Sequence, residues 1–169
     1  MAFRIYLAGP DVFFPEPLEL AKAHRAVLAQ FGLEGVFPLD NEIQATSPRA
    51  MAREIFEANC RLIDSCDGVL ANMMPFRGPS TDVGTAWEIG YAYALKKPIA
   101  GYTADLGEYR AKVFQTGHST SSNTPHDHQG HAIEHFELTD NLMLTESVVT
   151  IESSLEKAAG KLAAVLARR

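Results

Sequence analysis

Two carboxylates flank a run of small residues in 79-PSTDVGTAWEIGYAYAL-95, a stretch with few basic residues nearby to pair with them. Asp82 precedes the predicted helix, where a carboxylate can cap the first turn. Both this capping role and a functional role are open for Asp82. Glu88 shares one helical stripe with Gly84 and Ala92, so its neighbours on that face are small. A carboxylate in apolar surroundings is costly unless it is hydrogen-bonded or used. We therefore take Glu88 as a candidate reactive group.

The partner of Glu88 can be narrowed from the spacing of the residues around it. An exposed Glu88 paired with Lys96 or Lys97 is the plain alternative, although neither lysine lies four residues away. Tyr6 falls in the middle of a predicted strand and could donate a hydrogen bond to a carboxylate near the sheet end. Tyr93 comes five residues after Glu88, off its stripe. Tyr6 is therefore the better candidate for the hydrogen-bond donor to Glu88. The alternative is that Tyr6 only packs in the core.

The elements that must position these residues alternate between strands and helices. Strands are expected at 3–9, 35–39, 68–74, 98–103 and 147–151. Helices are expected at 16–31, 47–66 and 106–115, after Asp82, and after a capping box from Ser153 to Glu156. This alternation predicts one α/β domain, 1–169, with a parallel sheet. Ligands then bind beyond the carboxyl ends of the strands, at 9–14, 40–42, 72–82 and 102–103.

Composition excludes several other classes of protein. The 169 residues carry a formal net charge of -6, which argues against a nucleic-acid partner. No apolar run approaches the ~18 residues of a membrane span, so we expect no membrane partner and a cytoplasmic location. Cys60 and Cys66 fall on roughly opposite faces of one predicted helix, which indicates reduced thiols. Neither GxGxxG nor GxxxxGK[ST] occurs, and G-x-S-x-G is also missing.

Five of the six histidines lie between positions 118 and 135. Nothing anchors this segment on a regular element, and metal ligands need convergent geometry. We predict a mobile His-rich loop at 117–135 rather than a metal site.

Taken together, these motifs resemble the nucleoside 2-deoxyribosyltransferase family. The resemblance is carried by 5-IYLAGPDVF-13, 40-DNE-42, 56-FEANCRLIDSCDGVLANMMPFRGPSTDVGTAWEIGYA-92 and 140-DNLML-144. It implies a flavodoxin-like, doubly wound sheet of five parallel strands, order 2-1-3-4-5, with helices on both faces. It also implies exchange of nucleobases on 2-deoxyribonucleosides in nucleotide salvage, with a deoxynucleoside and a free nucleobase as substrates and no cofactor or metal.

The resemblance also assigns roles to individual residues. Glu88 matches the nucleophile, Tyr6 the tyrosine that orients it, and Asp82 an aspartate of the sugar and acid–base site. Asn141 and Met143 match a segment that completes the active site of a neighbouring subunit, which implies a homo-oligomer, at least a dimer. The expected substrate-binding residues of the chain's own site are Gly9, Pro10, Asp11, Phe13, Asp40, Asn59, Phe76, Arg77, Gly78 and Trp87.

The chain departs from some family members at Asn59, where they carry an aspartate that contacts the base. Asparagine can hydrogen-bond a base but cannot protonate it. Asp82, or Asp40 or Glu42 from the preceding loop, would then be the proton donor to the leaving base.

The mechanism expected from this resemblance is a double displacement. Glu88 attacks C1′ as the base leaves and forms a covalent deoxyribosyl ester. A second base then attacks C1′ from the vacated face, which gives net retention of configuration.

Three other activities stay open at this point. A 5′-monophosphate N-glycosidase of the same fold would use water as acceptor, but Asp11 and Asp82 would repel its phosphate, and Arg77 is the one residue that favours it. A hydrolase of free deoxynucleosides would share the covalent intermediate, although Phe13, Phe14, Phe76 and Trp87 could stack an incoming base and keep water out. A non-catalytic nucleoside-binding module would leave the glycosidic bond intact.

Overall fold

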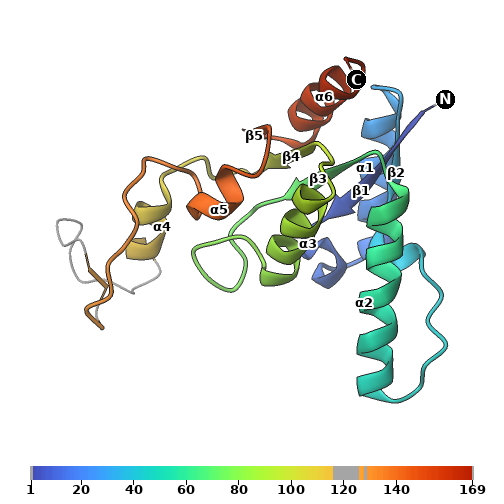
Figure 1. The fold of residues 1–169 in the computed structure, drawn as a ribbon, viewed down its shortest axis with the longest axis horizontal. Helices are drawn as coiled ribbons and strands as arrows, with labels where there is room; N and C mark the ends of the chain where they lie inside the picture. Colours follow the sequence, from blue (N-terminus) through green and yellow to red (C-terminus); the bar gives the residue numbers. More distant parts are fainter. Residues whose placement is uncertain (1, 116–125, 128, 169) are drawn as a thin grey trace.

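The computed structural model describes residues 2–115, 126–127 and 129–168. Its core is one sheet of five parallel strands in the order β2-β1-β3-β4-β5 (Figure 1), which confirms the predicted fold and strand order. The strands are β1 (Phe3–Ala8), β2 (Leu33–Val36), β3 (Gly68–Asn72), β4 (Ile99–Tyr102) and β5 (Thr150–Glu152). All five residues of β3 are buried, as expected of a central parallel strand with both faces covered.

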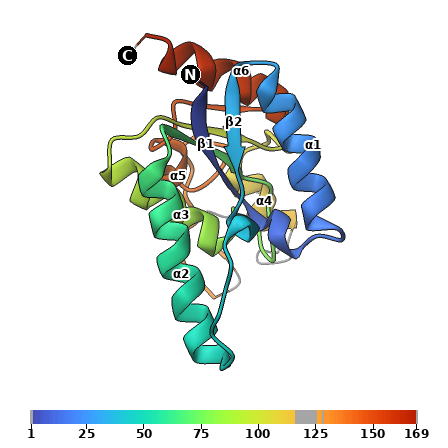
Figure 2. The ribbon, with the colours of Figure 1, turned by 90° about the vertical axis from the view of Figure 1, so that its right-hand side faces the viewer.

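Helices cover both faces of the sheet (Figure 2). The helices are α1 (Pro17–Ala29), α2 (Pro48–Ser65), α3 (Val83–Ala94), α4 (Tyr109–Gln115), α5 (Leu142–Thr145) and α6 (Leu155–Leu166). Side chains alternate along β1, so Ile5 and Leu7 pack with α1 and α6 while Tyr6 and Ala8 pack with α2, α3 and α5. This alternation turns Tyr6 toward the face that carries Glu88.

Several predicted boundaries differ from the structure. The strand expected at 35–39 is instead Leu33–Val36, because Pro38 cannot donate to a sheet and begins a 3-10 helix, η2 (Pro38–Asp40). The strand expected at 147–151 is Thr150–Glu152. The capping box from Ser153 to Glu156 was wrong: Ser154, whose backbone is extended, caps α6 and accepts from Lys157 N at 3.3 Å. Ser153 Oγ instead accepts from the Lys157 ammonium at 2.8 Å.

Gly9 links β1 to a second 3-10 helix, η1 (Pro10–Phe13), at the edge of the sheet where the predicted site lies. A Cβ atom at Gly9 would stand 2.3 Å from Asp11 Oδ2 and 2.7 Å from the Asn72 Cβ. Only glycine therefore lets η1 turn back this closely across the end of β3.

Two parts of the chain project beyond the sheet. The lower half of α2 and the segment at 41–47 extend side by side from one end (Figures 1 and 2), while α4 and the segment before α5 lie on the opposite side of the molecule (Figure 1). Within the described ranges, no helix combines the length and apolar character needed to cross a membrane. Both cysteines are free thiols.

The His-rich loop predicted at 117–135 lies largely outside the described residues. Of the described histidines, His131 contacts Asp127 through Nδ1 at 3.1 Å. No cluster of three or more metal-ligating side chains occurs in the part of the chain that the structure describes.

Candidate active site

Glu88 and Tyr6 lie against each other at the centre of the candidate site. Tyr6 is fully buried in β1, and its hydroxyl donates to Glu88 Oε1 at 2.6 Å. The hydrogen bond predicted from the sequence is therefore present. No described residue hydrogen-bonds to Oε2, which leaves that oxygen free to meet a ligand. Lys97 instead donates to the carbonyl oxygens of Asp64 and Cys66, so it does not neutralise Glu88.

This environment changes the acidity of both groups. Burial raises the pKa of Glu88 to about 7, against the opposing effect of the Tyr6 hydrogen bond and with a further upward push from the charge of Asp82. Burial, and then the Glu88 charge, raise the pKa of Tyr6 far above its usual range, so its hydroxyl stays a donor. Near neutral pH Glu88 is thus present in both its acid and its ionised form, as is common for groups in active sites.

Glu88 opens onto a cavity of about 530 Å³ at the carboxyl end of β1. The cavity lies between η1, η2, α2 and α3, where ligands bind in open α/β sheets. Of the predicted site residues, it brings together Gly9, Phe13, Asn59, Asp82 and Glu88. Of its other lining residues, Val12 and Asn41 fall in the strand-end segments where ligands were expected, and Gly84 shares the helical stripe of Glu88. Sequence reasoning missed the rest, which are Pro38, Leu39, Ile43, Ala52, Ile55 and Thr85.

Asp82 lies at the start of α3 and also lines the cavity. Its Oδ2 accepts from the backbone N–H groups of Gly84 at 3.0 Å and Thr85 at 3.2 Å, so it caps the helix as predicted. No described residue hydrogen-bonds to Oδ1. One carboxylate oxygen therefore fixes the helix and the other is available to a ligand.

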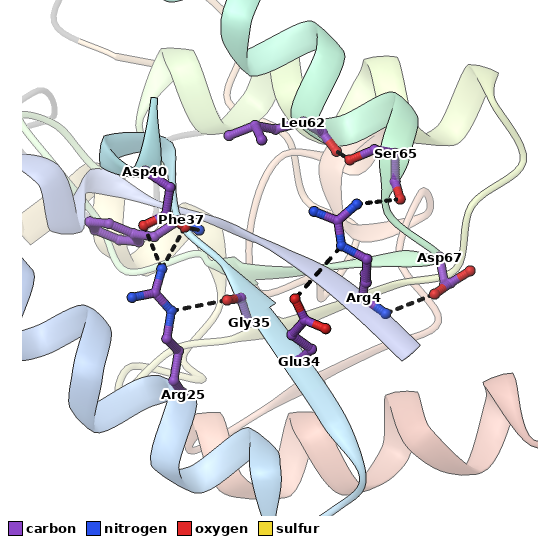
Figure 3. A network of polar contacts seen from close by, with 9 residues as sticks. All are labelled: Arg4, Arg25, Glu34, Gly35, Phe37, Asp40, Leu62, Ser65 and Asp67. Carbon is purple, nitrogen blue, oxygen red and sulfur yellow. Dashed lines mark hydrogen bonds and ion pairs between the residues drawn. The ribbon is translucent and has the colours of Figure 1, made fainter. Parts of the chain in front are cut away.

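The other two candidate proton donors lie outside the set of residues that lines the cavity. Asp40 forms an ion pair with Arg25 of α1, and its Oδ2 also accepts from Phe37 N at 2.8 Å (Figure 3). Arg25 Nε donates to the Gly35 carbonyl at 3.0 Å, which ties this cluster to the edge strand β2. Glu42 is exposed. Asp82 alone among the three lines the cavity.

An aromatic cluster borders the cavity at Phe13. The Phe13 and Phe76 rings stack with centroids 5.6 Å apart, and the Arg77 guanidinium lies 5.0 Å and 4.7 Å from their centres. Arg77 has a φ of 56°, an unusual conformation for a residue other than glycine, and Gly78 follows it in the same loop. Trp87 packs instead on Phe56 and Tyr91, away from the residues that line the cavity.

Beneath this cluster, Pro10 and Asp11 are buried. Asp11 accepts from the Asn72 amide at 3.0 Å, so it holds η1 against the end of β3. Neither residue lines the cavity.

Asn141 and Met143 do not line the cavity of their own chain. Asn141 caps α5 by accepting from Met143 N at 3.0 Å, and its amide donates to Glu134 Oε1 at 2.5 Å. The Met143 side chain is 72% exposed.

Asp140, just before this segment, is a buried anchor that sequence reasoning missed. Its Oδ2 accepts from Thr81 N at 2.9 Å and Thr81 Oγ1 at 2.7 Å, and its Oδ1 from Ser80 Oγ and from Asn141 N. It thereby joins the loop before α3 to the start of α5. Its place beside Asn141 in 140-DNLML-144 was the one available signal.

Comparison with known proteins identifies the family of this chain. Residues 5–143 match the family model described as nucleoside 2-deoxyribosyltransferase. The chain belongs to the nucleoside 2-deoxyribosyltransferase family. It is 31% identical to a 2-desoxiribosyltransferase from Leishmania mexicana, with a TM-score of 0.74 over 96% of this chain and 97% of that one. A 2-deoxyribosyltransferase from Bacillus psychrosaccharolyticus shares the fold at 22% identity, with a TM-score of 0.61 over 96% and 95% of the two chains.

A curated relative from Schizosaccharomyces pombe, an uncharacterized protein, is 39% identical over 113 residues. The match covers 64% of this chain and 54% of the relative, so the chain spans about half the length of the curated relative it matches.

Proposed function

We propose that this member of the family transfers 2-deoxyribose from one nucleobase to another through a covalent ester on Glu88. The observation that carries the proposal is the partly buried Glu88 carboxylate, held at Oε1 by Tyr6 and open to the cavity, with a pKa of about 7. A carboxylate of this kind suits attack on a sugar carbon, because burial makes it reactive and the tyrosine fixes its direction.

In the first half-reaction, Glu88 Oε2 bonds to C1′ of the donor nucleoside while the C1′–N bond breaks. The bonding electrons go to the departing base, which takes a proton from Asp82, the cavity carboxylate with a free oxygen. In the second, a ring nitrogen of the acceptor base attacks C1′ from the vacated face, and the ester bond breaks. The electrons return to the Glu88 carboxylate, the acceptor's ring proton returns to Asp82, and two inversions give net retention.

The sugar of the donor is expected to be unphosphorylated. Two carboxylates, Asp82 and Glu88, line the cavity, and its lining residues include no lysine or arginine. A dianionic 5′-phosphate would be repelled there, which disfavours the nucleotide N-glycosidase. Hydrolysis of free deoxynucleosides shares the ester and differs only in the acceptor.

We also propose a homo-oligomer in which Asn141 and Met143 complete the site of a neighbouring subunit. The exposed Met143 side chain and the position of Asn141 outside its own cavity support this arrangement.

A trapping experiment tests the covalent step. A 2′-deoxy-2′-fluoro nucleoside analogue slows both half-reactions, because fluorine destabilises the oxocarbenium-like transition state, and the ester should accumulate. Intact-mass spectrometry should show one fluorodeoxyribosyl adduct per chain, mapped by peptide sequencing to Glu88. The Glu88→Gln variant should show none. An adduct on another residue, or transfer without any adduct, would contradict the nucleophile assignment, while binding without transfer or adduct would indicate a non-catalytic module.

A further inference from the structure

Two chemically different groups of polar side chains line the cavity. One group consists of the carboxylates Asp82 and Glu88 with Thr85, all on or just before α3. The other is a pair of amides, Asn41 after η2 and Asn59 on α2. The remaining lining residues are glycines and apolar side chains. Among the described residues, the two amides are therefore the only polar side chains lining the cavity outside the group on α3.

The orientation of these amides follows from the chemistry of their partners. Asn41 Nδ2 lies 2.9 Å from the Pro38 carbonyl, which can only accept, so the NH₂ group of Asn41 must point to it. The same nitrogen lies 3.3 Å from Asn59 Oδ1 and supplies its second hydrogen there. Asn59 is thus fixed with its oxygen toward Asn41.

The Asn59 NH₂ group is left for a ligand. No described residue accepts a hydrogen bond from Asn59 Nδ2, and the side chain lines the cavity. The cavity therefore presents a two-hydrogen donor at this position. Such a neutral group can donate a hydrogen bond to an acceptor atom of a bound base but cannot protonate it.

We infer that Asn59, held in this orientation by Asn41, makes the enzyme selective for 6-oxopurine over 6-aminopurine deoxynucleosides. This inference rests on the proposed function. A 6-oxopurine offers two adjacent acceptors, O6 and N7, on one edge, whereas adenine offers N7 beside the N6–H₂ donor. The Asn59 NH₂ group can donate to both acceptors of the first edge, whereas on the second edge it can donate only to N7 and faces the N6–H₂ group donor to donor. Asn41 is a positioning residue, because it acts through Asn59.

The test compares deoxyinosine and deoxyadenosine as donors, with 2,6-diaminopurine as the shared acceptor. In a double displacement, kcat/KM for the donor reports only the first half-reaction, so the acceptor does not influence the comparison. The wild-type enzyme should prefer deoxyinosine by about tenfold or more, the discrimination of one well-placed pair of base contacts. Asn59→Asp, which removes the donor, should abolish or reverse this preference.

Asn41→Ala should reduce the preference to about threefold or less, because the Asn59 amide can then turn its oxygen toward N6 of adenine. A purely structural role of Asn41 would lower both donor rates together and leave their ratio unchanged. The matched control is Gln44→Ala, an exposed residue of the same segment, which should retain the wild-type ratio.

The other possible outcomes would contradict either the base selectivity or the proposed function. A wild-type ratio near one, or a preference for deoxyadenosine, would overturn the inference, as would an unchanged ratio in Asn41→Ala. Exchange of thymidine but of neither purine nucleoside would overturn the base assignment and leave the proposed function in place. Failure with every deoxynucleoside would overturn the proposed function itself.

Discussion

At the scale of single residues, the properties of Glu88 come from a balance between burial and one hydrogen bond. Packing of α3 against β1 removes water from the carboxylate and raises its pKa to about 7. Tyr6 donates to the charged form and limits this rise. In the proposed mechanism Glu88 must be ionised to attack C1′, so the same balance would set the pH range of the transfer reaction.

The pH dependence of donor turnover follows from this balance. The kcat/KM value should rise with pH through about 7 as Glu88 loses its proton. Tyr6→Phe removes the donor that favours the carboxylate, so this limb should move to higher pH. The rate at pH 7 should fall by about 10- to 100-fold, the value of one hydrogen bond to a charged group.

The control for this pH profile is Tyr91→Phe. Tyr91 lies on α3, as Glu88 does, but its hydroxyl donates to Asp64 at 2.9 Å. This variant should leave the limb in place. A flat profile between pH 5 and 8 in the wild-type enzyme would contradict the role of Glu88.

Glu88 should also make stability depend on pH. The folded chain holds this proton more tightly than the unfolded chain, where the pKa is about 4.5. Its contribution to stability is therefore fully present below pH 4.5 and is lost as pH rises through about 7. Glu88→Gln should be inactive yet more stable than wild type at pH 8.5, by up to about 3 kcal/mol, and similar at pH 4.

Thermal or urea unfolding at the two pH values measures this difference. Glu57→Gln, an exposed control on α2, should change stability little at either pH. Equal stability of Glu88→Gln and wild type at pH 8.5 would show that burial does not penalise the Glu88 charge.

The sequence indicated Glu88, Tyr6 and Asp82 because helical spacing and strand alternation decide which faces such residues occupy. It did not indicate the contact of Asn41 with Asn59, since this depends on how η2 and α2 approach each other. The same limit explains Trp87, which was expected to bind the substrate but packs on Phe56 and Tyr91.

At the scale of elements, the segment at 41–47 forms the outer wall of the cavity against α2. Glu54 holds it there by accepting from Gln44 N at 3.0 Å and Ala45 N at 2.8 Å, bonds that lower the pKa of Glu54. Ile43 from the segment and Ile55 from α2 line the cavity on either side of this contact. The wall is thus fastened by a side chain remote from the reacting atoms.

Loosening this wall should weaken substrate binding. In Glu54→Ala, KM for the donor nucleoside should rise about three- to tenfold, as expected for the loss of one or two hydrogen bonds, with kcat within about twofold. Glu57→Ala removes an exposed ion pair with Arg53 on the same helix and should leave KM unchanged. An unchanged KM in Glu54→Ala would show that the segment does not need this contact.

The strands and the longer helices were predictable in type and order because long apolar patterns and turn residues mark them, whereas the four-residue α5 and the two 3-10 helices were not predicted. The ends of helices and strands were harder to predict where two neighbouring residues could both mark the boundary. Ser153 and Ser154 could both cap α6, and the choice depended on how far β5 continues along β4, a tertiary contact. Asp140 was missed because its partners lie 59 and 60 residues earlier in the chain.

At the scale of the whole molecule, Asn141 and Met143 are proposed to complete the site of another subunit. Subunit mixing tests this proposal. Asn141→Ala and Glu88→Ala should each be nearly inactive. Their co-expression in equal amounts should restore about a quarter of wild-type activity, because random assembly gives that share of sites with neither change.

The control combines Asp82→Ala with Glu88→Ala, two changes that belong to the same half of the site, and should restore nothing. No recovery in the first mixture would place Asn141 outside the neighbouring subunit's site. Oligomeric assembly could not be derived from the patterns of one chain, because a surface used between copies resembles any other partly apolar surface.

Base exchange tests the central claim most directly. The protein is mixed with deoxyinosine and free adenine, and the products are separated by chromatography, with a parallel reaction containing deoxyinosine monophosphate. Deoxyadenosine should form in the first reaction with the wild-type protein and should be absent with Glu88→Ala. Hypoxanthine released only from the monophosphate, or deoxyadenosine formed equally by Glu88→Ala, would contradict a deoxyribosyl transfer through Glu88.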